Sequence, residues 1–93
     1  MKMDKELLIR HLDMNYNLAK LNFDNLNNPE TLKETNKNNL LLVVLCYCQA
    51  FGGIWKIYNN FMTYNKNDLV EVELVKKYHW CEKFTGEYFG FTI

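Results

Sequence analysis

The sequence has no excess of charge of either sign, because its 11 basic and 11 acidic side chains give a formal net charge of zero. Only one arginine, Arg10, accompanies ten lysines, and no block of basic residues is present. Proteins that bind nucleic acids or anionic membranes usually depend on the long-range attraction that such a block provides. The composition therefore disfavours both kinds of ligand.

The sequence also lacks a catalytic signature and a nucleotide-binding loop. Residues 1–39 are charged throughout and contain no apolar core of a signal peptide. The three cysteines are an odd number in apolar surroundings, which is more consistent with reduced, buried thiols than with a disulfide scaffold. We therefore expect a cytoplasmic protein that is not an enzyme and that holds no cofactor.

Two short patterns could still carry chemistry. Cys46 and Cys48, together with His79 and Cys81, are a ligand set that zinc accepts, but residues 46 and 48 would diverge by about 200° on a helix. His79 and Cys81 are two residues apart, a poor arrangement for a base and its nucleophile, and no third group orients them. We expect no metal site and no catalytic residue here. Glu71 and Glu73 could bind a cation or act as an acid–base pair, but such a pair is more often a solvated face.

What the sequence does have is a long apolar stretch over residues 40–64. Its few polar residues recur every three or four positions, which predicts a helix that is apolar around most of its circumference. About 25 residues is long for a helix, so we expect a bend or break at Gly52-Gly53, where glycine weakens the helix. Close backbone approach by a partner is the alternative role for these glycines.

A membrane span is the rival interpretation of the same residues. The uncharged run from Leu40 to Trp55 has 16 residues, whereas a bilayer core needs ~20. Gln49 and Lys56 also fit poorly within any extension of the run. We therefore expect no membrane insertion.

Two helices are predicted before this stretch. Residues 4–26 place apolar side chains four and three apart, which predicts an amphipathic helix with Asp4 as its N-cap. Asn28 and Pro29 have the chemistry of an N-cap and a first helical residue, so a short second helix follows. Asn38 or Asn39 is expected to cap the central helix. The first helix is expected to pack against the central one; its seam could alternatively form an oligomer interface through Ile9, Leu12, Tyr16 and Phe23.

The C-terminal third is ambiguous. Residues 69–75 alternate between apolar and acidic side chains, which favours a half-buried strand, and Phe89, Phe91 and Ile93 alternate in the same way. The same region also fits a helix from an Asn67 cap to a stop at Gly86. We predict an α+β fold, with helical N-terminal two thirds and a small C-terminal antiparallel β element, in one small domain of residues 1–93. The alternative is an all-α bundle.

The chain is 48% hydrophobic and 15% aromatic, more apolar material than a monomer of 93 residues readily conceals. This favours a non-enzymatic protein-binding module that inhibits or regulates another protein. We also expect the module to form a homo-oligomer, and a dimer is favoured. The excess of lysine over arginine and the thirteen asparagines are typical of an AT-rich genome. Small chains from such genomes include phage- or plasmid-borne inhibitors of host defence nucleases, an analogy without a motif. A small nucleic-acid-binding regulator and a membrane-associated protein are the alternatives. The expected partner-binding residues are aromatic: Trp55, Tyr58, Tyr78, Trp80, Tyr88, Phe89 and Phe91.

Overall fold

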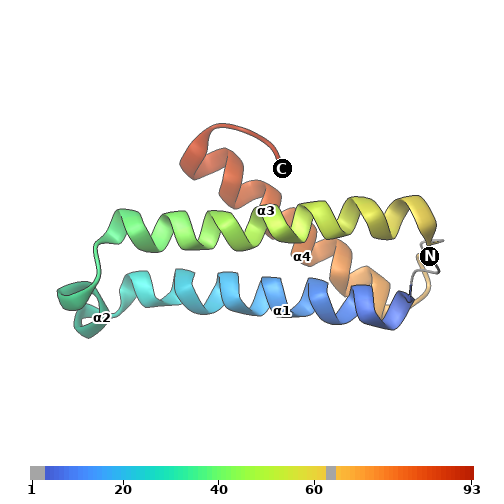
Figure 1. The fold of residues 1–93 in the computed structure, drawn as a ribbon, viewed down its shortest axis with the longest axis horizontal. Coiled ribbons are helices and arrows are strands. Elements are labelled where there is room, and N and C mark those ends of the chain that lie inside the picture. The colour runs from blue at the N-terminus through green and yellow to red at the C-terminus, as the bar shows by residue number, and fades with distance from the viewer. Residues whose placement is uncertain (1–3, 63–64) are drawn as a thin grey trace.

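The computed structural model describes residues 4–62 and 65–93, and within them every regular element is a helix (Figure 1). The elements are α1 (Lys5–Asp24), the 3₁₀ helix η1 (Asn25–Asn27), α2 (Pro29–Glu34), α3 (Lys37–Phe61) and α4 (Leu69–Phe89). The predicted C-terminal antiparallel β element is absent from these residues, so the α+β prediction was wrong. The all-α alternative fits the structure.

Helices α1 and α3 lie side by side and antiparallel along most of their lengths, connected at one end by η1 and α2 (Figure 1). Helix α4 packs across this pair and contacts both helices. The core lies between the three long helices. Its fully buried members include Leu12 from α1, Phe51 and Tyr58 from α3, and Leu74 from α4.

Each α-helix begins at an Asp or Asn whose side chain accepts a hydrogen bond from a backbone N–H of the first turn. The predicted caps Asp4 and Asn28 are confirmed, at 3.0 Å from the Glu6 and Glu30 nitrogens. The cap of α3 is Asn36, not Asn38 or Asn39, because the helix starts two or three residues earlier than expected. Most of the polar run before the apolar stretch therefore belongs to the helix.

Helix α4 replaces the predicted strand because local capping and distant contacts both favour a helix. The Asp68 carboxylate accepts from the Val70 and Glu71 nitrogens at 2.8 and 3.3 Å, and so starts the helix at the point where the alternating pattern begins. Burial then follows a helical period, since Leu74, Cys81 and Phe84 are buried while Val70 is 53% exposed. The helix ends not at Gly86 but at Gly90, whose φ of 73° is the left-handed conformation that glycine favours at a helix end.

Gly52-Gly53 does not break α3, which runs from Lys37 to Phe61 as one helix. Gly52 instead makes room for the chain's own C-terminus. A Cβ atom added at Gly52 would lie 3.1 Å from the Ile93 side chain. The close approach that the two glycines suggested is therefore made by this chain, as residues after Gly90 turn back onto α3 (Figure 1).

Alanine substitutions at two helical glycines should separate these roles. Gly86→Ala in α4 meets nothing within 4 Å, so it should raise the free energy of unfolding by about 0.5–1 kcal/mol through helix propensity. Gly52→Ala should gain clearly less, because its Cβ pushes against Ile93. Urea denaturation of both variants measures the difference, and equal gains would show that Ile93 does not pack on Gly52.

The buried seam of α1 keeps Leu12 from the predicted seam but shifts by one residue at two positions, from Ile9 to Leu8 and from Tyr16 to Asn15. Its buried side chains are Leu8, Leu12, Asn15 and Ala19, while Ile9, Tyr16 and Phe23 are half-buried. The shift arises because α1 contacts two helices, so its apolar stripe is wider than a single seam. Tyr16 and Phe23 pack on α4 through edge contacts with Trp80.

Candidate functional site

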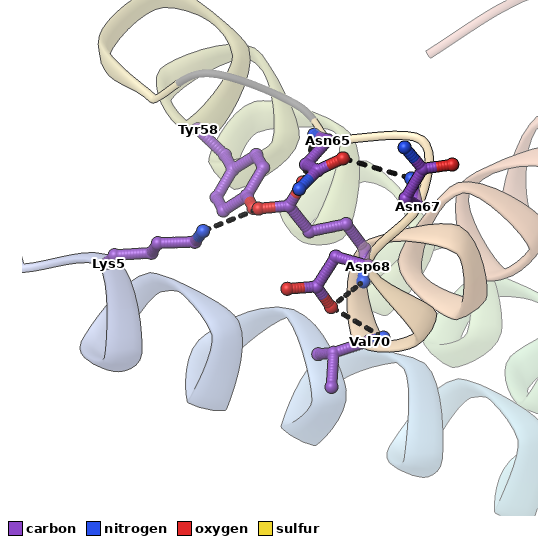
Figure 2. A network of polar contacts seen from close by, with 7 residues as sticks. Lys5, Tyr58, Asn65, Asn67, Asp68 and Val70 are labelled. Atoms are coloured by element: carbon purple, nitrogen blue, oxygen red, sulfur yellow. Dashed lines mark hydrogen bonds and ion pairs between the residues drawn. The ribbon is translucent and has the colours of Figure 1, made fainter.

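A buried carboxylate lies where the ends of α1, α3 and α4 meet. Glu71 is 1% exposed, and its Oε1 is 2.7 Å from the Tyr58 hydroxyl and 2.5 Å from the Lys5 ammonium. Its Oε2 accepts from the backbone N–H of Asn65. In Figure 2, Lys5 at the start of α1, Tyr58 near the end of α3 and Asn65 in the loop before α4 lie around one point, which is where they contact the Glu71 carboxylate.

These contacts favour the charged form of Glu71. Hydrogen bonds from Lys5 and then Tyr58 lower the pKa of Glu71 from 4.5 to about 2, against the opposing effect of burial. Burial and the bond to Glu71 raise the pKa of Tyr58, and the same carboxylate raises the pKa of Lys5. We call Lys5, Tyr58, Asn65 and Glu71 the clasp, because their polar contacts join α1, α3, the loop before α4 and α4 itself. Its role is therefore structural.

Glu71 and Glu73 do not form an acid–base pair. Glu73 is exposed and lies 3.1 Å from Lys76, whereas Glu71 is enclosed by Tyr58 and Lys5. The expectation that both carboxylates face solvent was wrong for Glu71, because residues distant in sequence enclose it and supply its partners.

The clasp predicts a pH dependence of stability. A carboxyl with a lowered folded-state pKa stabilises the fold fully above its unfolded pKa, and loses that contribution as pH falls through the folded value. For Glu71 the loss should run from about pH 4.5 down to about pH 2. Glu71→Gln removes this titration. The difference in the free energy of unfolding between wild type and variant should therefore decrease as the pH falls from about 4.5 to about 2. Denaturant midpoints measured from pH 5 to pH 2 test this, and parallel curves would contradict it.

A second cluster, here called the aromatic face, consists of Phe23, Trp80, Phe84 and Tyr88. The last three lie four residues apart on α4 and therefore share one side of it. The Phe23 ring of α1 stands edge-on to all three, with centroid distances of 5.4, 5.8 and 6.2 Å. Edge contacts of this kind add to the apolar burial that joins α1 to α4.

The aromatic face surrounds a hollow of about 200 Å³ whose rim includes Lys83 and Glu87. Tyr88 is 47% exposed at its edge, so the hollow is open to solvent. The Lys20 ammonium lies 4.8 Å from the Trp80 ring centroid, a cation–π distance. The arrangement offers an apolar depression with a charged rim.

Every lysine near the aromatic face has an acidic neighbour. Lys77 lies 2.9 Å from Asp13, Lys83 lies 3.8 Å from Glu87 and Lys20 lies 4.0 Å from Asp24. Lys76 pairs with Glu73 in the same way. The positive charge is therefore largely neutralised where aromatic and basic residues mix.

The predicted partner-binding residues separate into two groups. Trp55 is 8% exposed and Tyr58 is fully buried; Trp55 stacks on Phe51, Tyr58 and half-buried Tyr78 inside the core. Of the others, Trp80 and Tyr88 belong to the aromatic face, Phe89 is half-buried against Phe84, and Phe91 is 43% exposed in the C-terminal segment.

The predicted oligomer residues are also drawn inward, with Leu12 fully buried and Ile9, Tyr16 and Phe23 half-buried within one chain. Sequence reasoning missed Phe84, the centre of the aromatic face. The spacing of residues 80, 84 and 88 marks it, but only when the segment is treated as a helix.

No family model, curated protein or solved structure matches the chain. The interpretation of both clusters therefore depends on their geometry.

The cysteines occupy two environments. Cys46 is exposed, whereas Cys48 and Cys81 are fully buried in the core, where a hydrogen bond between them and burial raise the pKa of the Cys81 thiol. His79 is exposed and lies 3.7 Å from Glu82. Within residues 4–62 and 65–93, no group of three or more His, Cys, Asp or Glu side chains is placed to hold a metal ion.

Helix α3 leaves one long side uncovered. By length and composition it is the one helix in the described part of the chain that could cross a membrane. Of its most apolar window, 39% is buried inside the structure, so much of this apolar helix is exposed. We call the uncovered side the open face of α3, formed by Leu42, Val43, Cys46, Ala50, Gly53, Ile57 and Phe61.

Proposed function

We propose that the protein is a non-enzymatic binding module that regulates or inhibits another intracellular protein through its aromatic face. The hollow between Phe23, Trp80 and Tyr88 carries this proposal. Exposed Trp, Tyr and Phe side chains supply large contact areas at modest entropic cost and dominate protein interfaces. The occupant is an aromatic or aliphatic side chain of the partner, which the apolar floor would enclose.

The volume and the lining of the hollow support a protein ligand. A hollow of about 200 Å³ is smaller than the ~300–1,000 Å³ of most small-molecule sites, but it matches a single anchoring side chain. The aromatic floor is held by α1 and α4 together, so it is formed before binding. The rim pair of Lys83 and Glu87 offers both a donor and an acceptor to a polar backbone.

The paired lysines weigh against the nucleic-acid alternative. Bases would have to stack on Trp80 or Tyr78 while lysines reach phosphates. Lys77 and Lys76 already have carboxylate partners, and Tyr78 stacks on Trp55 in the core. A phosphate contact here would cost an existing ion pair, so the protein ligand is preferred.

Affinity capture with matched variants tests the proposal. Tyr88→Ala removes an exposed ring from the hollow, whereas Leu69→Ala alters an 81% exposed side chain at the other end of the same helix. Wild type and Leu69→Ala should retain a specific partner from the native cell, identified by mass spectrometry, and Tyr88→Ala should retain at least ten-fold less. Equal retention by both variants would contradict the proposal.

A single-stranded oligonucleotide provides the second arm of the experiment. The binding module should not bind it at low salt. Binding that weakens steeply as salt is raised would instead support a nucleic-acid-binding regulator and overturn the proposed function.

A further inference from the structure

We propose that the open face of α3 is the interface of a homodimer, in which the α3 helices of two copies pack antiparallel about a two-fold axis between Ala50 and Gly53. This inference is independent of the proposed function, because the open face and the aromatic face share no residue. It assigns a surface and an occupant, a second copy of this chain.

The spacing of the open face is symmetric. Its central row is Leu42, Cys46, Ala50, Gly53, Ile57 and Phe61, with intervals of four, four, three, four and four residues. Read from either end, the row keeps the same intervals and stays within about 100° of the helix circumference. An antiparallel copy therefore meets it in register, as an isologous contact requires.

The side chains along this row are complementary in size. With the axis between Ala50 and Gly53, the two smallest residues oppose each other and allow close approach of the helices. Cys46 then lies level with Ile57 of the second copy, and Leu42 lies level with Phe61. Leu42 and Phe61 are 50% and 68% exposed in one chain, so this pairing covers the most exposed apolar residues of the helix.

The charges select the antiparallel arrangement. Helix α3 has no acidic residue, and Lys56 is the one charge near the middle of its exposed side. A parallel pair would place the two Lys56 side chains level with each other, and it would also align the helix dipoles unfavourably. In the antiparallel register their backbone positions are offset by roughly 14 Å along the axis.

The chain exposes more surface and is more extended than a compact monomer of its size. Its accessible surface is 6238 Å², and a folded monomer of 11.2 kDa has about 5,700 Å². Its radius of gyration is 14.4 Å, against about 12 Å for a compact domain of this length. Covering about 500 Å² on each copy would remove the excess, an area typical of a weak, reversible dimer and not of an obligate one.

The surroundings of α3 favour a second copy over a lipid bilayer. The opposite side of α3 is packed along α1, which carries Arg10, Asp13, Lys20 and Asp24. Insertion of α3 would bring these charges into hydrocarbon or strip α1 from the core. A second copy covers the open face without disturbing either helix.

Sedimentation velocity across a range of protein concentrations tests the dimer. Wild type should shift from 11.2 kDa to twice that mass at micromolar concentration. Ala50→Glu places two carboxylates at the axis and should weaken association at least ten-fold, whereas Leu69→Glu, on an exposed side chain of α4, should not. Circular dichroism confirms that both variants fold. If wild type stays monomeric even at a concentration 100-fold above the micromolar range, the proposal is overturned.

Oxidative cross-linking tests the register. In the antiparallel dimer the two Cys46 positions are offset by roughly 16 Å, so wild type should not cross-link when copper phenanthroline is added. Ile57→Cys should cross-link to Cys46 of the second copy and give a covalent dimer on a non-reducing gel. A Cys46–Cys46 bond in wild type, or stable binding of the monomer to phosphatidylglycerol vesicles, would overturn it.

Discussion

Replacing Glu71 with alanine is expected to lower the free energy of unfolding by about 3 kcal/mol. The substitution removes the acceptor of the Asn65 N–H and of the Tyr58 hydroxyl, and burial of Tyr58 keeps water from replacing the lost acceptor there. Lys5 loses its partner as well, but 45% of its side chain is exposed, so it can turn to solvent. For a chain of this length the midpoint of thermal unfolding should fall by roughly 15 °C.

Glu73→Ala is the matched control, because it removes a carboxylate two residues away on the same helix. Glu73 is 58% exposed and forms a surface ion pair with Lys76, so its loss should change stability by less than about 0.5 kcal/mol. Differential scanning calorimetry of the two variants gives the comparison. Similar losses at both positions would show that Glu71 is not enclosed as described.

Leu12→Ala is expected to destabilise the protein by about 2–5 kcal/mol, the range for a large-to-small change in a packed core. Leu12 is fully buried between α1 and its neighbours, so the truncated side chain leaves a cavity within one chain. An interface residue would behave differently, since its loss would matter more as the protein becomes more concentrated. The loss should therefore be the same at every protein concentration.

Leu21 on the same helix serves as the comparison. It is 58% exposed, so Leu21→Ala should shift stability by no more than about 0.5 kcal/mol. Urea denaturation at two concentrations, at least 20-fold apart, separates the two roles of α1. A Leu12→Ala effect that grows with concentration would return this residue to an oligomer interface.

The first three helices were predictable because each carried local signals. Asp4 and Asn28 capped the helices that they preceded, and the apolar stretch of α3 had a helical period. The exact seam of α1 was not predictable. A stripe that serves two neighbours is wider than one seam, and nothing in residues 4–26 says that α4 will cover Tyr16 and Phe23.

The C-terminal third was mispredicted because its alternation is compatible with either structure. Strand periodicity placed Glu71 beside Glu73 on a wet face, whereas its actual partners Lys5 and Tyr58 lie far away in sequence. The local signals for a helix, a cap at Asn67 and a stop at Gly86, were each misplaced, since the cap is Asp68 and the helix ends at Gly90. Once the helix is accepted, the spacing of Trp80, Phe84 and Tyr88 follows directly, and so does the aromatic face.

The two surfaces give α3 and α4 different roles. Helix α3 supplies most of the core on one side and an uncovered apolar face on the other, while α4 holds the aromatic face against α1. A dimer through α3 would leave both copies of the aromatic face open. Two binding sites in one assembly would then raise the avidity for a partner that is itself repeated.

Thiol labelling of the native protein tests the central claim, that α3 is packed by α1 and α4 on one side and open on the other. Cys46 and Cys48 lie on the same helix, yet Cys46 is exposed while Cys48 and Cys81 are 0% exposed. In dilute buffer a maleimide should modify one thiol per chain, at Cys46, and reach the other two only after unfolding. Modification of Cys48 or Cys81 at the rate of Cys46 would contradict the account.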